Sequence, residues 1–420
     1  MKNNYAKIIL SLMLAITLLL NFSGCGFRVH ADDLMEGITA NEVAGKETDE
    51  AFISAEREFA LALFKRSAAE AGKRNVMISP LSVQIALAMT ANGAKGNTKS
   101  EIESLICSGL TLEELNGYLA YYVENLPSGE KYKLDTANSI WFIDDEDRFV
   151  PEKSFLQTNA DYYKAQIYRA DFSAATLKDI NNWAEYYTDG MIDKILDSIS
   201  RESVMYLINA IVFDAKWENE YEKKDVDNNA LFTDINGNEQ KASMMMSTES
   251  RYIEAGNATG FAKQYKDEKY SFVALLPNEG IDVFDYAASL DADALAGILG
   301  GMEHESVKVG IPKFESGYSV EMSQILASLG VRDAFDPVSA DFTGIGKSGD
   351  GNIRIDEVIH KTYISVDEKG TKAAAVTLIG MKNGSAFVEK RVVLDRPFVY
   401  MIVDNSSNIP LFMGVLTSLN

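Results

Sequence analysis

The sequence predicts a single α+β domain with a large mixed or antiparallel sheet, and three observations lead to that expectation. Short apolar runs typical of strands alternate irregularly with helical patterns, without the strand–helix–strand order of a parallel sheet. Neither an internal repeat nor a linker interrupts residues 51–420. Hydrophobic residues make up 46% of the 420-residue chain, which is enough to form a sizeable core.

Residues 1–24 have the features of an export signal peptide. Lys2 and Lys7 give a positive start, and an almost unbroken apolar run follows from Ile8 to Leu20. This run is shorter than the roughly 20 residues that a membrane-spanning helix needs. We therefore expect the chain to be exported.

A lipid anchor is predicted where this signal ends. The segment Phe22–Cys25 resembles a bacterial lipobox, in which the cysteine is lipidated and becomes the new N-terminus. Phe22 departs from the usual aliphatic residue, so cleavage nearby by an ordinary signal peptidase is the alternative. Residues 25–50 are polar, acidic and unpatterned, which predicts a flexible tether. The expected location is extracellular, with Cys25 anchoring the protein to the outer face of a bacterial membrane.

The domain begins with a helical stretch and a short buried strand. From Ala51, apolar residues recur at three- and four-residue spacings, which predicts a helix. Asn75–Ser79 is short and apolar, as in a strand. Pro80 suits the first turn of a second helix, where its missing N–H is not needed and Ser79 is placed to cap. That helix is apolar on nearly all sides up to Met89, so we expect it in the core.

Strands dominate the rest of the chain. Leu207–Phe213 is a continuous apolar run, typical of a central strand covered on both faces. Other expected strands lie at Thr136–Phe142, Tyr270–Leu276 and Val307–Ile311. One further helix is expected over Val320–Leu329.

Charge and cysteine content argue against two further features. The net charge of -22 argues against nucleic-acid binding, because a polyanion needs a basic face. Of the two cysteines, Cys25 belongs to the leader, so Cys107 is unpaired. Cys107 lies in a helical pattern and is expected to be a small buried hydrophobe. Stability is therefore expected to come from packing, without a disulfide.

Motifs for catalysis and metal binding are missing from the sequence. The three histidines are His30, His304 and His360, and only His360 lies in an expected strand. There is neither a G-x-S-x-G elbow nor an H-E-x-x-H helix nor a C-x-x-C pair, so we expect no enzyme, no metal and no cofactor. Gly344–Gly349 matches G-x-G-x-x-G, but an Asp-Gly-Asn turn follows it instead of a helix that would bind a phosphate.

The strongest functional pattern follows an alternating strand at Ile359–Val366, which ends before Gly370. One face of the period-two repeat that comes next consists of small residues: Thr371, Ala373, Ala375 and Thr377. A strand that enters a narrow slot in a sheet needs such a face, whereas a solvated loop does not. The alternative is an Ala-rich helical turn followed by a Gly-Ser loop.

Several segments resemble the serpin family, in order, over essentially all of residues 51–420. Glu368–Ala375, which reads E-K-G-T-K-A-A-A, resembles the hinge of the reactive-centre loop of inhibitory serpins. Val393–Ile402 resembles the serpin signature, and Ile409–Val415 resembles the last strands of the family. Together these matches are far more specific than a single short motif.

The resemblance implies a fold with a large main sheet, two smaller sheets, about eight or nine helices and an exposed reactive-centre loop at about residues 368–392. It implies a suicide-substrate inhibitor of a serine (or alternatively a cysteine) protease, which traps the acyl-enzyme when the cleaved loop inserts into the main sheet. The alternative is a non-inhibitory serpin that acts as a binding or storage module. Such a protein should have bulky or charged residues on the inward face of the hinge. A monomer is expected.

The resemblance also implies roles for individual residues. The hinge comprises Glu368, Gly370, Thr371, Ala373, Ala374 and Ala375. A polar cluster where the main sheet opens comprises Ser79, Ser82, Asn209 and His360. Lys313 is expected to pair with the hinge carboxylate of Glu368, and Trp217 to lie at the upper end of the main sheet. The alternatives are a core histidine without a gating role and two unrelated surface charges.

The family's spacing places the reactive bond. Counting from Gly370 gives Gly384–Ser385, and counting back from Pro397 gives Ala386–Phe387. Both positions put a small residue before the bond, which suits elastase-like or subtilisin-like proteases. Lys382 is the competing position, because a trypsin-like protease prefers a basic residue.

Overall fold

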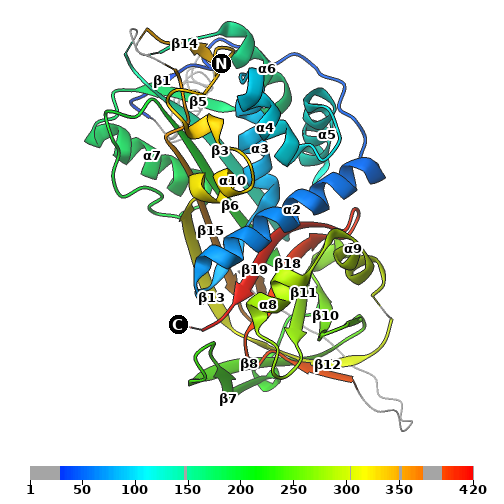
Figure 1. The fold of residues 1–420 in the computed structure, drawn as a ribbon. Helices are drawn as coiled ribbons and strands as arrows, with labels where there is room; N and C mark the ends of the chain where they lie inside the picture. The colour runs from blue at the N-terminus through cyan, green and yellow to red at the C-terminus, as the bar shows by residue number, and fades with distance from the viewer. Residues whose placement is uncertain (1–28, 146–148, 303, 350–351, 372–389, 420) are drawn as a thin grey trace, which may run out of the picture.

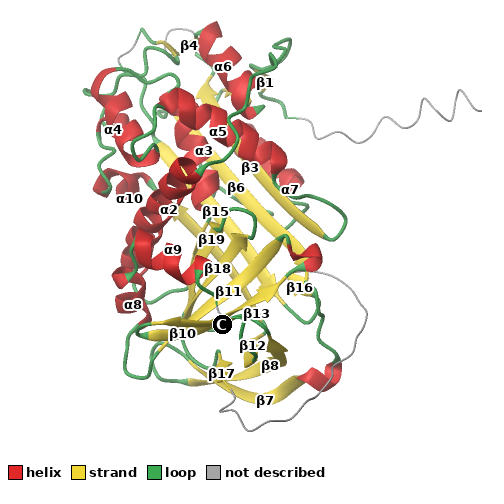
Figure 2. Ribbon diagram, turned by 90° about the vertical axis from the view of Figure 1, so that its right-hand side faces the viewer, coloured by secondary structure: helices red, strands yellow, loops and turns green. Residues whose placement is uncertain are grey.

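The computed structural model describes residues 29–145, 149–302, 304–349, 352–371 and 390–419. Most helices gather at one end of an elongated molecule, and the smaller sheets form the other end (Figure 1). The main sheet extends beneath the helices, as the turned view shows (Figure 2). The predicted α+β class with a large mixed sheet is confirmed.

The described residues form nine α-helices and three short 3₁₀ helices. The α-helices are α2 (Glu50–Ala71), α3 (Pro80–Ala91), α4 (Gly96–Ile106), α5 (Leu112–Asn125), α6 (Lys153–Tyr163), α7 (Ala174–Tyr187), α8 (Val283–Ser289), α9 (Ala292–Gly300) and α10 (Ser323–Ser328). The 3₁₀ helices are η1 (Lys223–Asp225), η2 (Lys266–Glu268) and η3 (Asp333–Phe335).

The main sheet has seven strands in the order β1-β5-β3-β6-β15-β13, with β16 paired to β6. Their bounds are β1 (Asp32–Asp33), β5 (Gln166–Ala170), β3 (Tyr132–Ile143), β6 (Met205–Lys216), β15 (Glu357–Val366), β13 (Phe314–Glu321) and β16 (Gly370–Thr371). The β3–β5 and β6–β15 pairs are parallel, and the other pairs are antiparallel. The central strand β6 is buried from Met205 to Phe213, as its apolar run predicts.

Two smaller sheets and a two-stranded ribbon complete the fold. The second sheet consists of β2 (Val76–Ile78), β19 (Ile409–Leu416), β18 (Phe398–Asp404), β11 (Tyr270–Pro277), β10 (Ala258–Gln264) and β9 (Tyr252–Ala255). The third consists of β17 (Lys390–Val393), β12 (Val307–Pro312), β8 (Glu239–Glu249) and β7 (Val226–Thr233). The ribbon pairs β14 (Gly346–Lys347) with β4 (Val150–Pro151), so the middle of the G-x-G-x-x-G match forms a short β-strand and is not followed by a helix in the described residues.

Helix α3 lies against the main sheet, and every one of its residues is buried. Pro80 occupies its first turn, as predicted, but the side chain of Ser79 makes no capping bond. The backbone N–H of Ser79 is instead used in the polar cluster described below. Cys107 is unpaired and buried, and burial raises the pKa of its thiol to about 12. It is the small buried hydrophobe that the sequence predicts.

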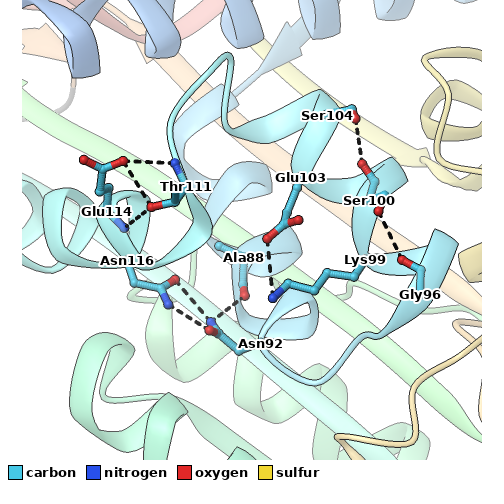
Figure 3. A network of polar contacts seen from close by, with 10 residues as sticks. All are labelled: Ala88, Asn92, Gly96, Lys99, Ser100, Glu103, Ser104, Thr111, Glu114 and Asn116. Carbon is cyan, nitrogen blue, oxygen red and sulfur yellow. Dashed lines mark hydrogen bonds and ion pairs between the residues drawn. The ribbon is translucent and has the colours of Figure 1, made fainter.

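Polar contacts fix α3 to α5, as Figure 3 shows. Thr111 and Glu114 form a capping box at the start of α5, with backbone N–H groups donating at 3.1 and 3.2 Å. Asn92, at the end of α3, exchanges two hydrogen bonds with Asn116 of α5, at 3.2 and 2.7 Å. The C-terminal end of α3, which packs against the main sheet, is thus tied to α5.

Residues 29–49, which we call the N-terminal strap, lie on the domain and correct part of the predicted flexible tether. Asp32 and Asp33 pair with β5, and Leu34 N–H donates to the Ile167 carbonyl at 2.9 Å. Lys46 Nζ lies 3.0 Å from Oε1 of Glu114. The apolar side chains of the strap pack against the core, and they are Val29, Ala31, Leu34, Met35 and Ile38. These residues are too few and too irregularly spaced to show a periodic pattern, so only the tertiary partners reveal the strap.

The helix expected over Val320–Leu329 is shorter than predicted. Strand β13 continues to Glu321, because Val320 pairs with His360 in the β13–β15 ladder. Helix α10 begins only at Ser323.

Candidate functional site

The candidate site is the seam between β6 and β15, where one end of the loop has already entered. Glu357–Tyr363 of β15 pairs in parallel with Tyr206–Val212 of β6. Beyond that point β16 takes over, with Gly370 opposite Lys216 and Thr371 opposite Ala215, in the antiparallel sense. Figure 2 shows β16 at the end of the main sheet, near the smaller sheets. The first hinge residues therefore occupy the top of a strand position between β6 and β15.

This position admits only small residues. Gly370 has φ +150°, and a Cβ there would lie 2.1 Å from the Ala215 carbonyl oxygen, so a larger residue clashes with the backbone of β6. Thr371 is 1% exposed, and its hydroxyl lies 2.9 Å from the hydroxyl of Tyr265. The structure thus requires a glycine at residue 370, and it buries Thr371, the first residue of the small inward face that the sequence shows.

Trp217 and Tyr221, which we call the hinge clamp, hold the three residues before Gly370 by their carbonyls. Trp217 donates its backbone N–H to Lys369 and its indole N–H to Asp367, both at 2.9 Å. Tyr221 donates its backbone N–H to Glu368 at 2.8 Å. Both clamp residues are buried, at 0% and 8% exposure. The clamp fixes the turn between β15 and β16.

Lys313 and Glu368 form an ion pair at the same turn, and both side chains are about one-third exposed. Partial burial is the largest single effect and opposes ionisation of Glu368, but the hydrogen bond from Lys313, a backbone hydrogen bond and the nearby lysine charges together outweigh it and lower the pKa of the carboxyl. The Lys313 backbone donates to Ser243 at 2.9 Å, which ties the pair to the third sheet. The structure thus brings together the two charges that the resemblance associates.

A buried polar cluster lies lower in the seam. His360 is fully buried, accepts from the Ser79 backbone N–H at 3.1 Å through Nε2, and donates from Nδ1 to Oδ1 of Asn209. Asn209 Nδ2 donates to Ser82 Oγ at 2.5 Å and also to Oδ1 of Asn138. Burial lowers the pKa of His360 to about 3, so the ring is neutral at physiological pH.

The structure brings together all four residues predicted for this cluster but changes one role. Ser79 takes part through its backbone, and its side-chain oxygen has no partner. Asn138 was missed, although its place in a predicted strand beside β6 made it a candidate. Tyr265 and Tyr221 were also missed at the hinge, because each comes from a segment with no local link to residues 367–371.

Several predicted residues lie outside the described part of the chain. They are the remaining hinge positions Ala373, Ala374 and Ala375, the reactive-bond candidates Gly384, Ser385, Ala386, Phe387 and Lys382, and the lipidation candidate Cys25. Within the described residues there is no cluster of His, Cys, Asp or Glu that could hold a metal ion. No helix among those residues is long and apolar enough to span a membrane.

Comparison with known families decides the identity. A family model described as "Serpin (serine protease inhibitor)" matches residues 54–419. The chain belongs to the serpin family. Human Serpin B8 is 30% identical to this serpin, and the match covers 86% of this serpin and 97% of Serpin B8. Human leukocyte elastase inhibitor is 29% identical, over 87% of this serpin and 98% of the relative.

Two solved structures of another serpin allow the fold and the conformation of this chain to be compared. The crystal structure of the thermophilic serpin tengpin in its native state is 48% identical, with a TM-score of 0.89, over 93% of this serpin and 100% of that chain. The structure of tengpin in its latent state is 47% identical and covers 90% of this serpin and 100% of that chain, but its TM-score is lower, at 0.79. The serpin fold is confirmed, and the described conformation is more similar to the native state than to the latent one.

We expect the stability of this serpin to fall in acid through His360. A histidine whose folded pKa is lowered stabilises the native state above its unfolded pKa near 6.5, and this contribution is lost as pH falls from 6.5 towards 3. The slope should be about 1.4 kcal/mol per pH unit. His360→Gln should flatten it, as measured by urea unfolding between pH 7 and 4. The exposed His304→Gln serves as the control and should keep the wild-type slope. Equal slopes for wild type and His360→Gln would contradict the assignment.

Proposed function

We propose that this serpin inhibits a serine protease as a suicide substrate. The observation that carries the proposal is that Gly370 and Thr371 already stand as the first residues of an extra strand on β6, where a Cβ at residue 370 would clash with β6 and the side chain of Thr371 is buried. After the protease serine attacks the reactive bond and forms the acyl-enzyme, the freed loop segment continues this strand down the seam. The attached protease is carried along and its active site is distorted before water can release it.

The sheet supplies the driving force. β6 and β15 are parallel to each other, and β16 runs antiparallel to β6. An inserted strand therefore replaces one parallel ladder by two antiparallel ladders, which form more hydrogen bonds and are slightly more stable per residue. Burial of the small apolar residues of the hinge adds to the gain. The uncleaved protein is thus held above a more stable state by a kinetic barrier.

The target is proposed to be an elastase-like or subtilisin-like protease. The reactive bond is assigned to Gly384–Ser385, with Ala386–Phe387 as the second candidate, and both have a small residue before the bond. One relative, human leukocyte elastase inhibitor, acts on an elastase according to its name, which agrees with this choice. Lys382 lies nearer the hinge, so cleavage there shortens the inserting strand and favours simple hydrolysis.

The place of action is proposed to be the outer face of a bacterial membrane. Residues 1–24 are proposed as a signal peptide, and Cys25 as the lipidated residue. Val29, four residues after Cys25 in the sequence, packs against the core of the domain. An anchor at Cys25 would therefore hold the inhibitor close to the membrane surface.

Thr371→Arg should turn the inhibitor into a substrate. Thr371 is already buried beside Tyr265, so an unpaired Arg there should displace the start of the strand from β6, at a cost of several kcal/mol, and remove the point from which insertion proceeds. The number of inhibitor molecules consumed per protease trapped should rise about tenfold or more, as judged by SDS-resistant complexes. Thr371→Ser, which keeps the size and the hydroxyl, should trap protease as the wild type does. Normal trapping by Thr371→Arg would show that insertion is not the mechanism.

Sequencing the C-terminal fragment released from the trapped complex should locate the reactive bond. A fragment that begins at Ser385 supports the first assignment, and one that begins at Phe387 supports the second. Efficient trapping of a trypsin-like protease with a fragment that begins at Asn383 would overturn the proposed specificity.

Cys25→Ala should move the protein from the membrane fraction to the soluble fraction in a bacterial host. The reason is that the apolar run of the leader is too short to hold the protein by itself. Cys25→Ser, which also lacks the thiol, should behave in the same way. A mature N-terminus at another residue, identified by mass spectrometry of the wild type, would exclude the lipid anchor.

A further inference from the structure

A buried ion pair lies beneath the hinge clamp. Lys263 of β10 is 1% exposed, and its Nζ lies 2.8 Å from Oε1 of Glu249 at the end of β8. The same Nζ donates to the Asn219 carbonyl at 3.1 Å. A buried ammonium group destabilises a protein unless it is paired and hydrogen-bonded, and both conditions are met here. Burial disfavours the charge, but the neighbouring Tyr221 and Glu249 raise the pKa of Lys263, so it stays protonated.

The charge of Lys263 faces the two clamp rings. Its Nζ lies 4.5 Å from the ring centroid of Tyr221 and 5.4 Å from that of Trp217, within the range of a cation–π contact. The hydroxyl of Tyr221 lies 3.0 Å from Ser247 Oγ, which donates at 2.6 Å to the same Oε1 of Glu249. Tyr221 is therefore held by its ring through Lys263 and by its hydroxyl through Ser247 and Glu249.

The clamp carries this positioning to the loop. From the same two residues, three backbone and indole N–H groups hold the carbonyls of Asp367, Glu368 and Lys369. These carbonyls form the turn that sets β16 in register on β6, with Gly370 opposite Lys216. The turn lies at the start of the inserting strand, so it must keep this geometry while the strand grows. A displaced ring in the clamp would weaken the register at the point where insertion begins.

We propose that Lys263 is a positioning residue for loop insertion: with Glu249 it fixes the hinge clamp and thereby increases the rate at which the cleaved loop enters the main sheet. This inference rests on the proposed inhibitory function in one respect, namely that loop insertion is the step that traps the protease. The entry of a cleaved loop can be measured without a target protease.

The test compares insertion rates after cleavage of the loop by a protease that is not trapped. The time course of heat resistance or of tryptophan fluorescence reports insertion. Lys263→Met keeps the length of the side chain and removes the charge, and we expect insertion to slow about fivefold. Lys224→Met is the matched control, because it removes one charge from an exposed pair with Glu222 in the segment that follows Tyr221. It should insert at the wild-type rate.

A double variant separates positioning from a role in folding. Lys263→Met leaves Glu249 without its partner, whereas Lys263→Met with Glu249→Gln leaves no unpaired charge. Before cleavage, the double variant should have the melting temperature of the wild type. After cleavage its loop should still insert slowly, because the rings of Trp217 and Tyr221 lack the ammonium group of Lys263. Recovery of the wild-type insertion rate in the double variant would overturn the inference, and so would an unchanged rate in Lys263→Met.

The outcome also distinguishes this inference from the proposed function. If the wild type traps protease while Lys263→Met inserts at the normal rate, the inference about Lys263 fails and the inhibitory function stands. If no protease is trapped but the cleaved loop inserts, and more slowly in Lys263→Met, the inhibitory function fails and Lys263 keeps its role.

Discussion

The parallel pairing of β6 with β15 is the constraint on which the rest of this serpin depends. The two strands are neighbours in the sheet over Tyr206–Val212, although they lie more than 140 residues apart in the sequence. Because both run in the same direction, a single strand of the opposite direction can pair with both at once. β16 has that direction and occupies the top of the seam. The described fold therefore already contains the start of the strand that would complete two antiparallel ladders. Below that start, β6 and β15 stay paired with each other, and their contacts keep the seam closed.

Neutral polar side chains hold the seam closed by hydrogen bonds, and such bonds can re-form after the strands part. His360, Asn209, Asn138 and Ser82 satisfy one another across β15, β6, β3 and α3 without a buried charge. A neutral polar cluster of this kind orders the centre of the sheet, because an unsatisfied amide or imidazole in the core is unfavourable. An apolar seam would lack this directional preference. A charged one would carry a large desolvation penalty whenever the strands part.

The upper end of the seam is where the three larger sheets meet. Trp217 follows the end of β6 in the main sheet, Lys263 belongs to β10 in the second sheet, and Glu249 ends β8 in the third. Lys313 lies between β12 of the third sheet and β13 of the main sheet. The hinge turn is thus surrounded by residues from all three larger sheets. The role proposed for Lys263, a buried lysine in a neighbouring sheet, follows from this arrangement.

The sequence by itself determined the elements whose signal is local. The continuous apolar run of β6, the apolar helix α3 after Pro80 and the small residues at Gly370 and Thr371 could all be predicted, because burial on every side or a narrow slot restricts residue type at each position. Only the tertiary structure decided the contacts that join distant segments. Asn138 becomes a member of the cluster because β3 lies beside β6, and Lys263 comes to face the hinge clamp because β10 brings it close to the Trp217 ring. In the sequence, Lys263 is an ordinary charge in an alternating strand, and the strap is an ordinary polar linker. Their roles depend on partners that sequence spacing does not specify, since hydrogen bonds and ion pairs require proximity in space rather than a repeating pattern along the chain.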